Sequence, residues 1–175
     1  MISQTIADVL NRQVGREFYS AYFYLSMSAY SDLLGLKGFA NWFMAKYHEE
    51  LQHAMKIYKY ILDQGAQVKL LPIEQPPSNY ENPLAMFEAT LLHEQKVTRN
   101  INELMDLAVS EKDHATHIFL QWFVTEQIEE EATVSEIINK IKLVGGKGDG
   151  LFMLDNQVGQ KVPAQLPLLT PMPVA

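Results

Sequence analysis

Six polar residues interrupt apolar stripes of helical spacing, and their types are those that bind metal ions. Four are carboxylates, one is an imidazole and one is an amide: Glu17, Glu50, His53, Glu94, Gln127 and Glu130. Because the sequence contains no cysteine, any metal must be held by oxygen and imidazole nitrogen. An oxygen-rich set with one imidazole suits iron or manganese better than a metal that prefers sulfur.

The six positions form a pattern of three that occurs twice along the chain. Positions 17, 50 and 53 are followed 77 residues later by positions 94, 127 and 130. Each half of the sequence therefore carries a single acid, a step of 33 residues, and a polar pair separated by three. This pattern indicates a duplicated helical hairpin. Packing the two hairpins together brings the six side chains to one level of a bundle.

Taken singly, these residues have ordinary interpretations. A lone glutamate on an apolar stripe usually keeps its carboxylate in water, and a lone histidine is more often a hydrogen-bonded core residue than a ligand. Several carboxylates buried together are different, because desolvation costs several kcal/mol for each ion. Protonation or bound cations can offset that cost. Two adjacent metals need a shared ligand, and Glu50, central in its helix, is the natural candidate.

Segments with a 3.6-residue apolar period fill most of the chain. They run over about residues 4–34, from Gly38 to Gly65, from Pro83 to the SEKD break at 110–113, and from Asp113 to near Val144. Asn82 is expected to cap the third segment, with Pro83 at its first helical position. No segment alternates with period two, so no strand is expected.

Two long helices, a loop over residues 66–81 and two more long helices predict an all-α four-helix bundle with one long crossover between helices two and three. After the GGKGDG segment, LFMLDNQVG predicts a short fifth helix, so residues 1–158 are expected to form one domain. Residues 159–175 are predicted to be a Pro-rich C-terminal tail. Its four prolines after Val162 favour an extended, PPII-like conformation.

These residues and their order on four helices resemble the non-haem bacterial ferritins, which belong to the ferritin-like di-iron proteins. The resemblance covers about residues 1–158. It is carried by Glu17, the EELQH stretch around Glu50 and His53, Glu94, and the WFVTEQIEEE stretch around Gln127 and Glu130. It implies a ferritin-like four-helix bundle with a di-iron site inside each subunit.

The resemblance also implies a role for each residue. The first iron would be bound by Glu17, Glu50 and His53. The second would be bound by Glu50, Glu94 and Glu130, with Gln127 close by. A third iron would be bound by Glu49, Glu126 and Glu129, with Glu130 shared.

Two residues near these ligands, Tyr24 and Glu131, are not expected to bind iron themselves. Tyr24 matches the family's tyrosine beside the di-iron site, although buried tyrosines often serve only core packing. Glu131 belongs to the same acidic run and is expected to be solvated.

Related families are separated by particular residues. Haem-carrying bacterioferritins have a Glu-x-x-His pair in both halves and a haem-ligating methionine, which would fall at Gln52, so no haem is expected. Rubrerythrins add a cysteine-bound iron module, which a chain without cysteine cannot form.

The resemblance implies a ferroxidase that stores and detoxifies iron. It would oxidise Fe(II) to Fe(III) with dioxygen or hydrogen peroxide and deposit ferric mineral in a hollow shell, expected to contain 24 subunits. One alternative is a di-iron oxidoreductase or peroxidase without mineral storage. Another is an interaction protein whose site is dead, which the complete set of ligand residues argues against.

The overall charge narrows the range of partners. Acidic residues number 21 against 14 basic ones, a net charge of −7, so a nucleic-acid-binding surface of clustered lysine and arginine is not expected. The N-terminal segment lacks the features of a signal peptide, and no segment is long and apolar enough to span a membrane. A cytoplasmic location without membrane partners is therefore expected.

Overall fold

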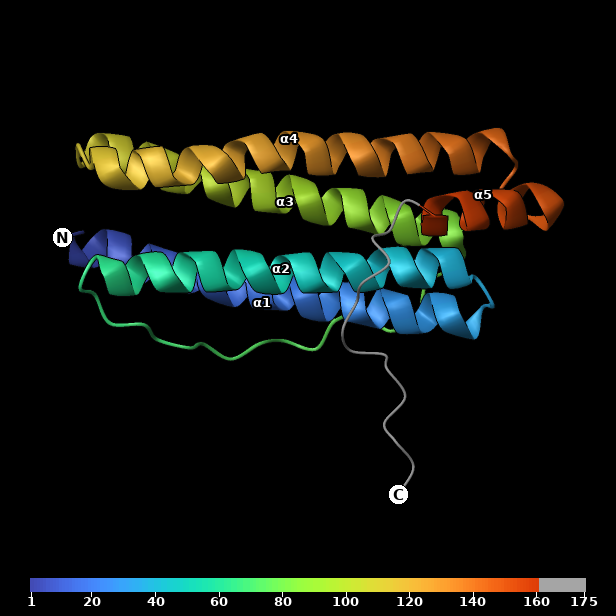
Figure 1. Cartoon of the computed structure of the whole chain (residues 1–175), viewed down its shortest axis with the longest axis horizontal. Helices are drawn as coiled ribbons and strands as arrows, with labels where there is room; N and C mark the ends of the chain where they lie inside the picture. Colours follow the sequence, from blue (N-terminus) through green and yellow to red (C-terminus); the bar gives the residue numbers. More distant parts are fainter. Residues whose placement is uncertain (161–175) are drawn as a thin grey trace, which may run out of the picture.

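A computed structural model describes residues 1–160 and consists of five α-helices, with no strand among these residues (Figure 1). The helices are α1 (Gln4–Leu33), α2 (Lys37–Asp63), α3 (Pro83–Ser110), α4 (His114–Leu143) and α5 (Gly148–Gln160). The predicted all-α bundle is confirmed, with the long crossover between α2 and α3. No helix among residues 1–160 is long and apolar enough to cross a membrane.

The ends of the helices follow from local chemistry. The Asn82 side chain accepts a hydrogen bond from the Ala85 backbone N–H at 2.9 Å, and Pro83 begins α3 as predicted. Asp113 caps α4 by accepting from the Thr116 N–H at 3.0 Å. Gly65 follows α2 with a φ of +72°, a conformation that glycine adopts without steric cost.

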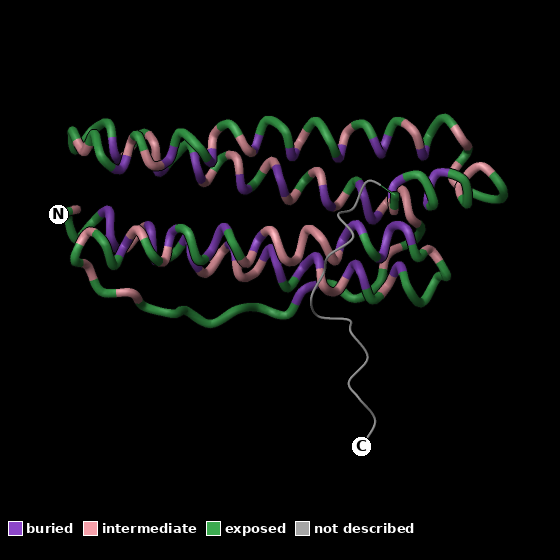
Figure 2. The backbone as a smooth tube through the Cα atoms, in the orientation of Figure 1, coloured by how far each residue is buried: buried purple, intermediate pink, exposed green. Residues whose placement is uncertain are grey.

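The long helices form two hairpins, α1 with α2 and α3 with α4 (Figure 1). The crossover after α2 runs along the length of the bundle, so α3 begins at the end opposite to where α2 stops. Purple, buried positions line the inward faces of the helices in Figure 2. The bundle is therefore held by apolar stripes that face one another.

The core is divided into two apolar clusters by a layer of buried polar side chains. This polar layer consists of Glu17, Glu50, His53, Glu94, Gln127 and Glu130. The first cluster includes Phe43 and Phe87, and the second includes Leu10, Ile57 and Ile101. On each of the four long helices, the first cluster lies on one side of the interrupting polar residues and the second lies on the other. The polar layer thus has dry, closely packed regions above and below it, which hold its side chains in place.

Helix α5 closes one end of the bundle by capping α2. The Asp155 carboxylate accepts hydrogen bonds from the Gly38 N–H at 3.0 Å and the Phe39 N–H at 2.7 Å. Leu36, the residue before α2, makes no side-chain cap of its own. A Cβ atom at Gly38 would lie 1.8 Å from the Asp155 carbonyl oxygen, so only glycine allows this close approach.

The fifth helix is longer than predicted at both ends. It begins at Gly148, inside the GGKGDG segment that precedes the predicted helix, and it continues to Gln160. The helix therefore passes the predicted domain boundary at residue 158. The Pro-rich tail was predicted to span residues 159–175; Gly159 and Gln160 belong to α5, and residues 161–175 lie outside the described residues.

Candidate metal centre

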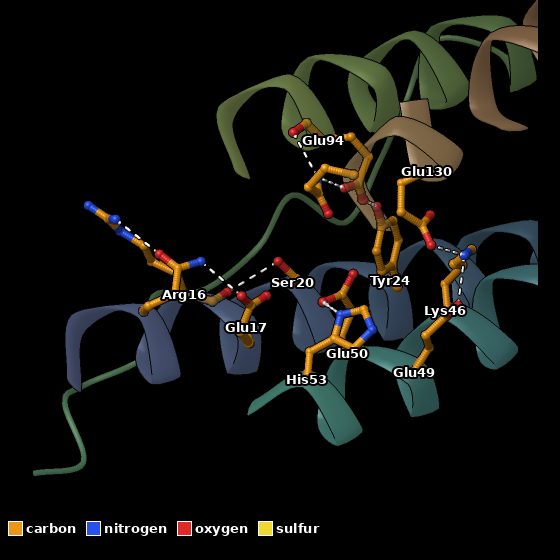
Figure 3. A network of polar contacts seen from close by, with 12 residues as sticks. Arg16, Glu17, Ser20, Tyr24, Lys46, Glu49, Glu50, His53, Glu94 and Glu130 are labelled. Atoms are coloured by element: carbon orange, nitrogen blue, oxygen red, sulfur yellow. Dashed lines mark hydrogen bonds and ion pairs between the residues drawn. The ribbon is translucent and has the colours of Figure 1, made fainter. Parts of the chain in front are cut away.

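The structure buries all six polar residues predicted from the sequence, with no more than 6 % of any of them exposed. They come from four helices: Glu17 from α1, Glu50 and His53 from α2, Glu94 from α3, and Gln127 and Glu130 from α4. Figure 3 shows the side chains from the two hairpins pointing toward one another. The six residues therefore lie in one buried layer inside one chain.

The most compact part of the layer joins α1 to α2. Glu17, Glu50 and His53 offer ligand atoms that all lie within 4.8 Å of one another, a spacing that allows one metal ion to contact all three. His53 Nδ1 lies 3.3 Å from Glu50 Oε2. The Gln13 amide donates to Glu17 at 2.8 Å and orients its carboxylate. This is the set expected to bind the first iron.

The two carboxyl groups of this set are more stable when they bind a proton or a cation than when they are ionised and unpaired. Burial, together with the charge of Glu50, raises the pKa of Glu17 to about 8. Burial also raises the pKa of Glu50 well above its ordinary value, and the charges of Glu94 and Glu130 add to the effect. A divalent cation that replaces these protons would remove the repulsion, so the electrostatics favour metal binding.

Glu94 is held by two donors. The Tyr24 hydroxyl donates to one carboxylate oxygen, and the Gln127 amide donates to the other at 2.9 Å. Burial raises the pKa of Glu94, while the Tyr24 and Gln127 hydrogen bonds act in the opposite direction. Tyr24, predicted to lie beside the site, thus contacts one of its carboxylates directly. In this arrangement Gln127 is a donor to Glu94.

Glu130 is paired with a residue that the sequence analysis missed. The Lys46 Nζ lies 2.5 Å from Glu130 Oε1 and 2.7 Å from Glu49 Oε2, with 12 % of the lysine side chain exposed (Figure 3). The second oxygen of Glu130 is buried and has no hydrogen-bond partner. Lys46 precedes Glu50 by four residues and His53 by seven, so helical spacing could have placed it on the same face of α2.

The predicted second iron set is less compact than the first. Glu50 interacts electrostatically with Glu94 and Glu130, so the three are neighbours. Among residues 1–160, however, neither Glu94 nor Glu130 belongs to a group of three acid or histidine ligands that already converge. Their oxygens are partly engaged by protein donors instead.

The predicted third set is only partly brought together. Glu49 and Glu126 lie within 4.8 Å of a third potential ligand, but this is His53. Glu129 is exposed on α4 and lies outside that group. Glu131, which was expected to be solvated, is only partly exposed: it lines a groove and accepts a hydrogen bond from Thr98 at 2.5 Å.

Solvent can approach the layer between α3 and α4. A groove of about 340 Å³ there is lined in part by Thr98, Gln127 and Glu131. Since Gln127 donates to Glu94, the floor of this groove is one hydrogen bond away from the carboxylates.

Comparisons with known proteins agree with this geometry. The family model described as "Ferritin-like domain" matches residues 7–144. The chain is 40 % identical over 161 residues to a bacterial non-heme ferritin of Bacteroides fragilis, covering 92 % of this chain and 100 % of the relative. It is 39 % identical over 158 residues to a bacterial non-heme ferritin of Campylobacter jejuni, covering 90 % of this chain and 95 % of the relative.

A solved structure is also similar. It is that of an open pore ferritin from the hyperthermophilic archaeon Archaeoglobus fulgidus, with a TM-score of 0.90 and 47 % sequence identity. The match covers 91 % of this chain and 98 % of the archaeal chain.

Proposed function

Because the chain belongs to the ferritin family, we propose that it is a ferroxidase that stores iron: it oxidises Fe(II) in the polar layer and deposits the ferric product as mineral inside a protein shell. The observation that carries the proposal is the buried convergence of Glu17, Glu50 and His53. Isolated buried carboxylates are costly, and a hard, oxygen-rich set with one imidazole suits iron.

The residues of this site have distinct tasks. The first Fe(II) binds to Glu17, Glu50 and His53 and releases the protons that these buried carboxyl groups hold. The second binds to Glu50, Glu94 and Glu130, with the unpartnered oxygen of Glu130 as a free ligand atom. Glu50 bridges both ions. The site therefore holds two metals a few ångströms apart between side chains buried inside the bundle.

The redox balance needs two irons and one oxidant. Each Fe(II) loses one electron, and dioxygen takes up both electrons with two protons to give hydrogen peroxide. When hydrogen peroxide is the oxidant, the same two electrons and two protons give two molecules of water. The protein supplies position and charge compensation, while iron is the substrate that leaves as Fe(III).

Storage requires an enclosed volume that one bundle does not provide. We assign the chain to a hollow homo-oligomer, with 24 subunits by its resemblance to the non-haem ferritins. Phe152 and Met153 on α5 support association, because both are large apolar side chains that are mostly exposed in the single chain.

The proposal is tested by anaerobic titration with Fe(II) followed by admission of oxygen. The protein should bind more than two irons per chain, oxidise them rapidly, and retain ferric mineral that co-elutes with the oligomer. Glu50→Ala should abolish the rapid oxidation of Fe(II), because it removes the bridging ligand. Glu103→Ala, an exposed acid on α3, is the matched control and should leave the rate unchanged.

Two results would count against the proposal. Unchanged rapid oxidation in Glu50→Ala would show that the site lies elsewhere. Binding that stops at two irons per chain, with no mineral, would favour a di-iron oxidoreductase without storage.

A further inference from the structure

A positively charged side chain occupies the interior of the polar layer among residues that otherwise gather negative charge. Lys46 reaches between α2 and α4 and places its ammonium between Glu49 and Glu130. We propose that Lys46 is a built-in cation that fills a third iron position, and that iron binds between Glu49 and Glu130 only by displacing the ammonium. This inference rests on the proposed function of the polar layer.

The geometry is that of a bridging cation. One Nζ atom lies 2.7 Å from Glu49 Oε2 and 2.5 Å from Glu130 Oε1, so a single charge joins carboxylates from two helices. A metal ion bound to the same two oxygens would occupy nearly the same point, because metal–carboxylate distances are about 2.0–2.2 Å. The ammonium and a metal ion at this point exclude each other.

The surroundings can complete a metal site once the ammonium has moved. Glu49 already lies within 4.8 Å of His53 and Glu126 through its ligand atoms. Glu130 keeps a second, buried oxygen that has no partner. Glu49 and Glu130 are therefore the carboxylates on which iron at this position depends.

The lysine has the freedom to leave. Its four-carbon stem is flexible, and part of the side chain is open to solvent. Trp42 offers a nearby aromatic face, with its ring centroid 5.8 Å from the ammonium. A displaced Lys46 can thus keep a favourable contact with a ring while its former position is filled.

The need to displace Lys46 would determine the order in which metal ions bind to the polar layer. While Lys46 neutralises Glu130, the convergent set of Glu17, Glu50 and His53 has no such internal competitor and fills first. The third ion must break both ion pairs of Lys46, so it binds more weakly. Lys46 would thereby set how many irons are held at low iron concentration.

The test uses the intact, metal-free oligomer and Co(II) as the probe, because Co(II) can be followed by calorimetry and visible absorption without oxidation. The unmodified protein should bind two Co(II) ions per chain tightly and a third weakly. Lys46→Met removes the charge and should tighten the third site by about tenfold or more, since breaking a buried ion pair leaves an uncompensated carboxylate. Lys46→Arg retains the charge and should behave as the unmodified protein does.

A matched control and a second variant keep the test decisive. Lys59→Met removes an exposed lysine of the same helix, whose ion pair is with Asp63, and should not change any Co(II) affinity. Lys46→Gln should reproduce the result of Lys46→Met if the latter does not assemble. An unchanged or weaker third site in a folded, uncharged variant would overturn the inference.

Crystals of the unmodified protein provide an independent measurement. At saturating Co(II), an anomalous peak should lie between Glu49 and Glu130, with the lysine ammonium displaced. Intact ion pairs to both glutamates at saturation would overturn the inference. Failure of the unmodified protein to bind the first two Co(II) ions would instead contradict the proposed function.

Discussion

Replacing Glu50 with glutamine is expected to stabilise the metal-free protein and, at the same time, to remove the stabilisation that metal ions confer. Glu50 is buried beside Glu17, and its charge is the second cause, after burial, of the raised pKa of Glu17. Glutamine has nearly the same shape but carries no charge, and its amide can donate to the Glu17 carboxylate. The substitution therefore relieves repulsion without leaving a cavity.

The magnitude follows from the pKa values. Each unit by which the pKa of Glu17 falls toward its ordinary value corresponds to about 1.4 kcal/mol, so a gain of roughly 1 to 3 kcal/mol is expected. For a chain of this length, that gain corresponds to an increase of about 2 to 12 °C in the unfolding midpoint. The gain should be largest near pH 8 and small at pH 5, because at pH 5 Glu17 is protonated in both proteins and has no charge for Glu50 to repel.

The assay is calorimetric unfolding of both proteins at equal concentration, at pH 5 and pH 8, with and without Co(II). Co(II) should raise the midpoint of the unmodified protein but have little effect on Glu50→Gln, which lacks the bridging carboxylate. Glu103→Gln serves as the exposed control and should match the unmodified protein in every condition. A metal-free Glu50→Gln that is less stable at pH 8, or that Co(II) stabilises as strongly as before, would refute the reasoning.

Two other consequences can be measured directly. The metal-free protein should lose stability as the pH rises from about 5 to 8. The pKa values of Glu130 and Glu17 are raised to about 7 and about 8, so over this range both residues bind protons in the folded state that the unfolded chain has already released. An unfolding midpoint that rises over this range would contradict the assignment. Tyr24→Phe should weaken binding of the second metal by about tenfold, because Glu94 loses a hydrogen-bond donor and a hydrogen bond to a charged group contributes roughly 1.5 kcal/mol or more. The affinity is measured by calorimetric titration with Co(II). An unchanged affinity would show that Tyr24 does not orient Glu94 for metal binding.

The polar layer was predictable because its members contradict the pattern around them. Glu17 and Glu94 stand where an apolar stripe requires an apolar residue, and the equal spacing of the two halves links them. Helix ends were also predictable, because Asn82 and Asp113 act on backbone groups only three residues away.

Long-range contacts account for what the sequence did not reveal. Asp155 caps a helix that begins more than 100 residues earlier, and nothing in its local sequence indicates that partner. The direction of a flexible side chain is equally hidden, since Lys46 could have extended into solvent as lysines usually do. For the same reason, Glu129 was grouped with Glu49 and Glu126, although its side chain is exposed and His53 takes the third place.

The central claim is that the polar layer binds two irons within one chain. Crystals of the metal-free protein, soaked anaerobically in Fe(II) and measured at the iron absorption edge, test it most directly. Two anomalous peaks are predicted in every subunit, one bound by Glu17, Glu50 and His53 and the other by Glu50, Glu94 and Glu130. A single peak, or iron bound only to exposed carboxylates, would contradict the claim.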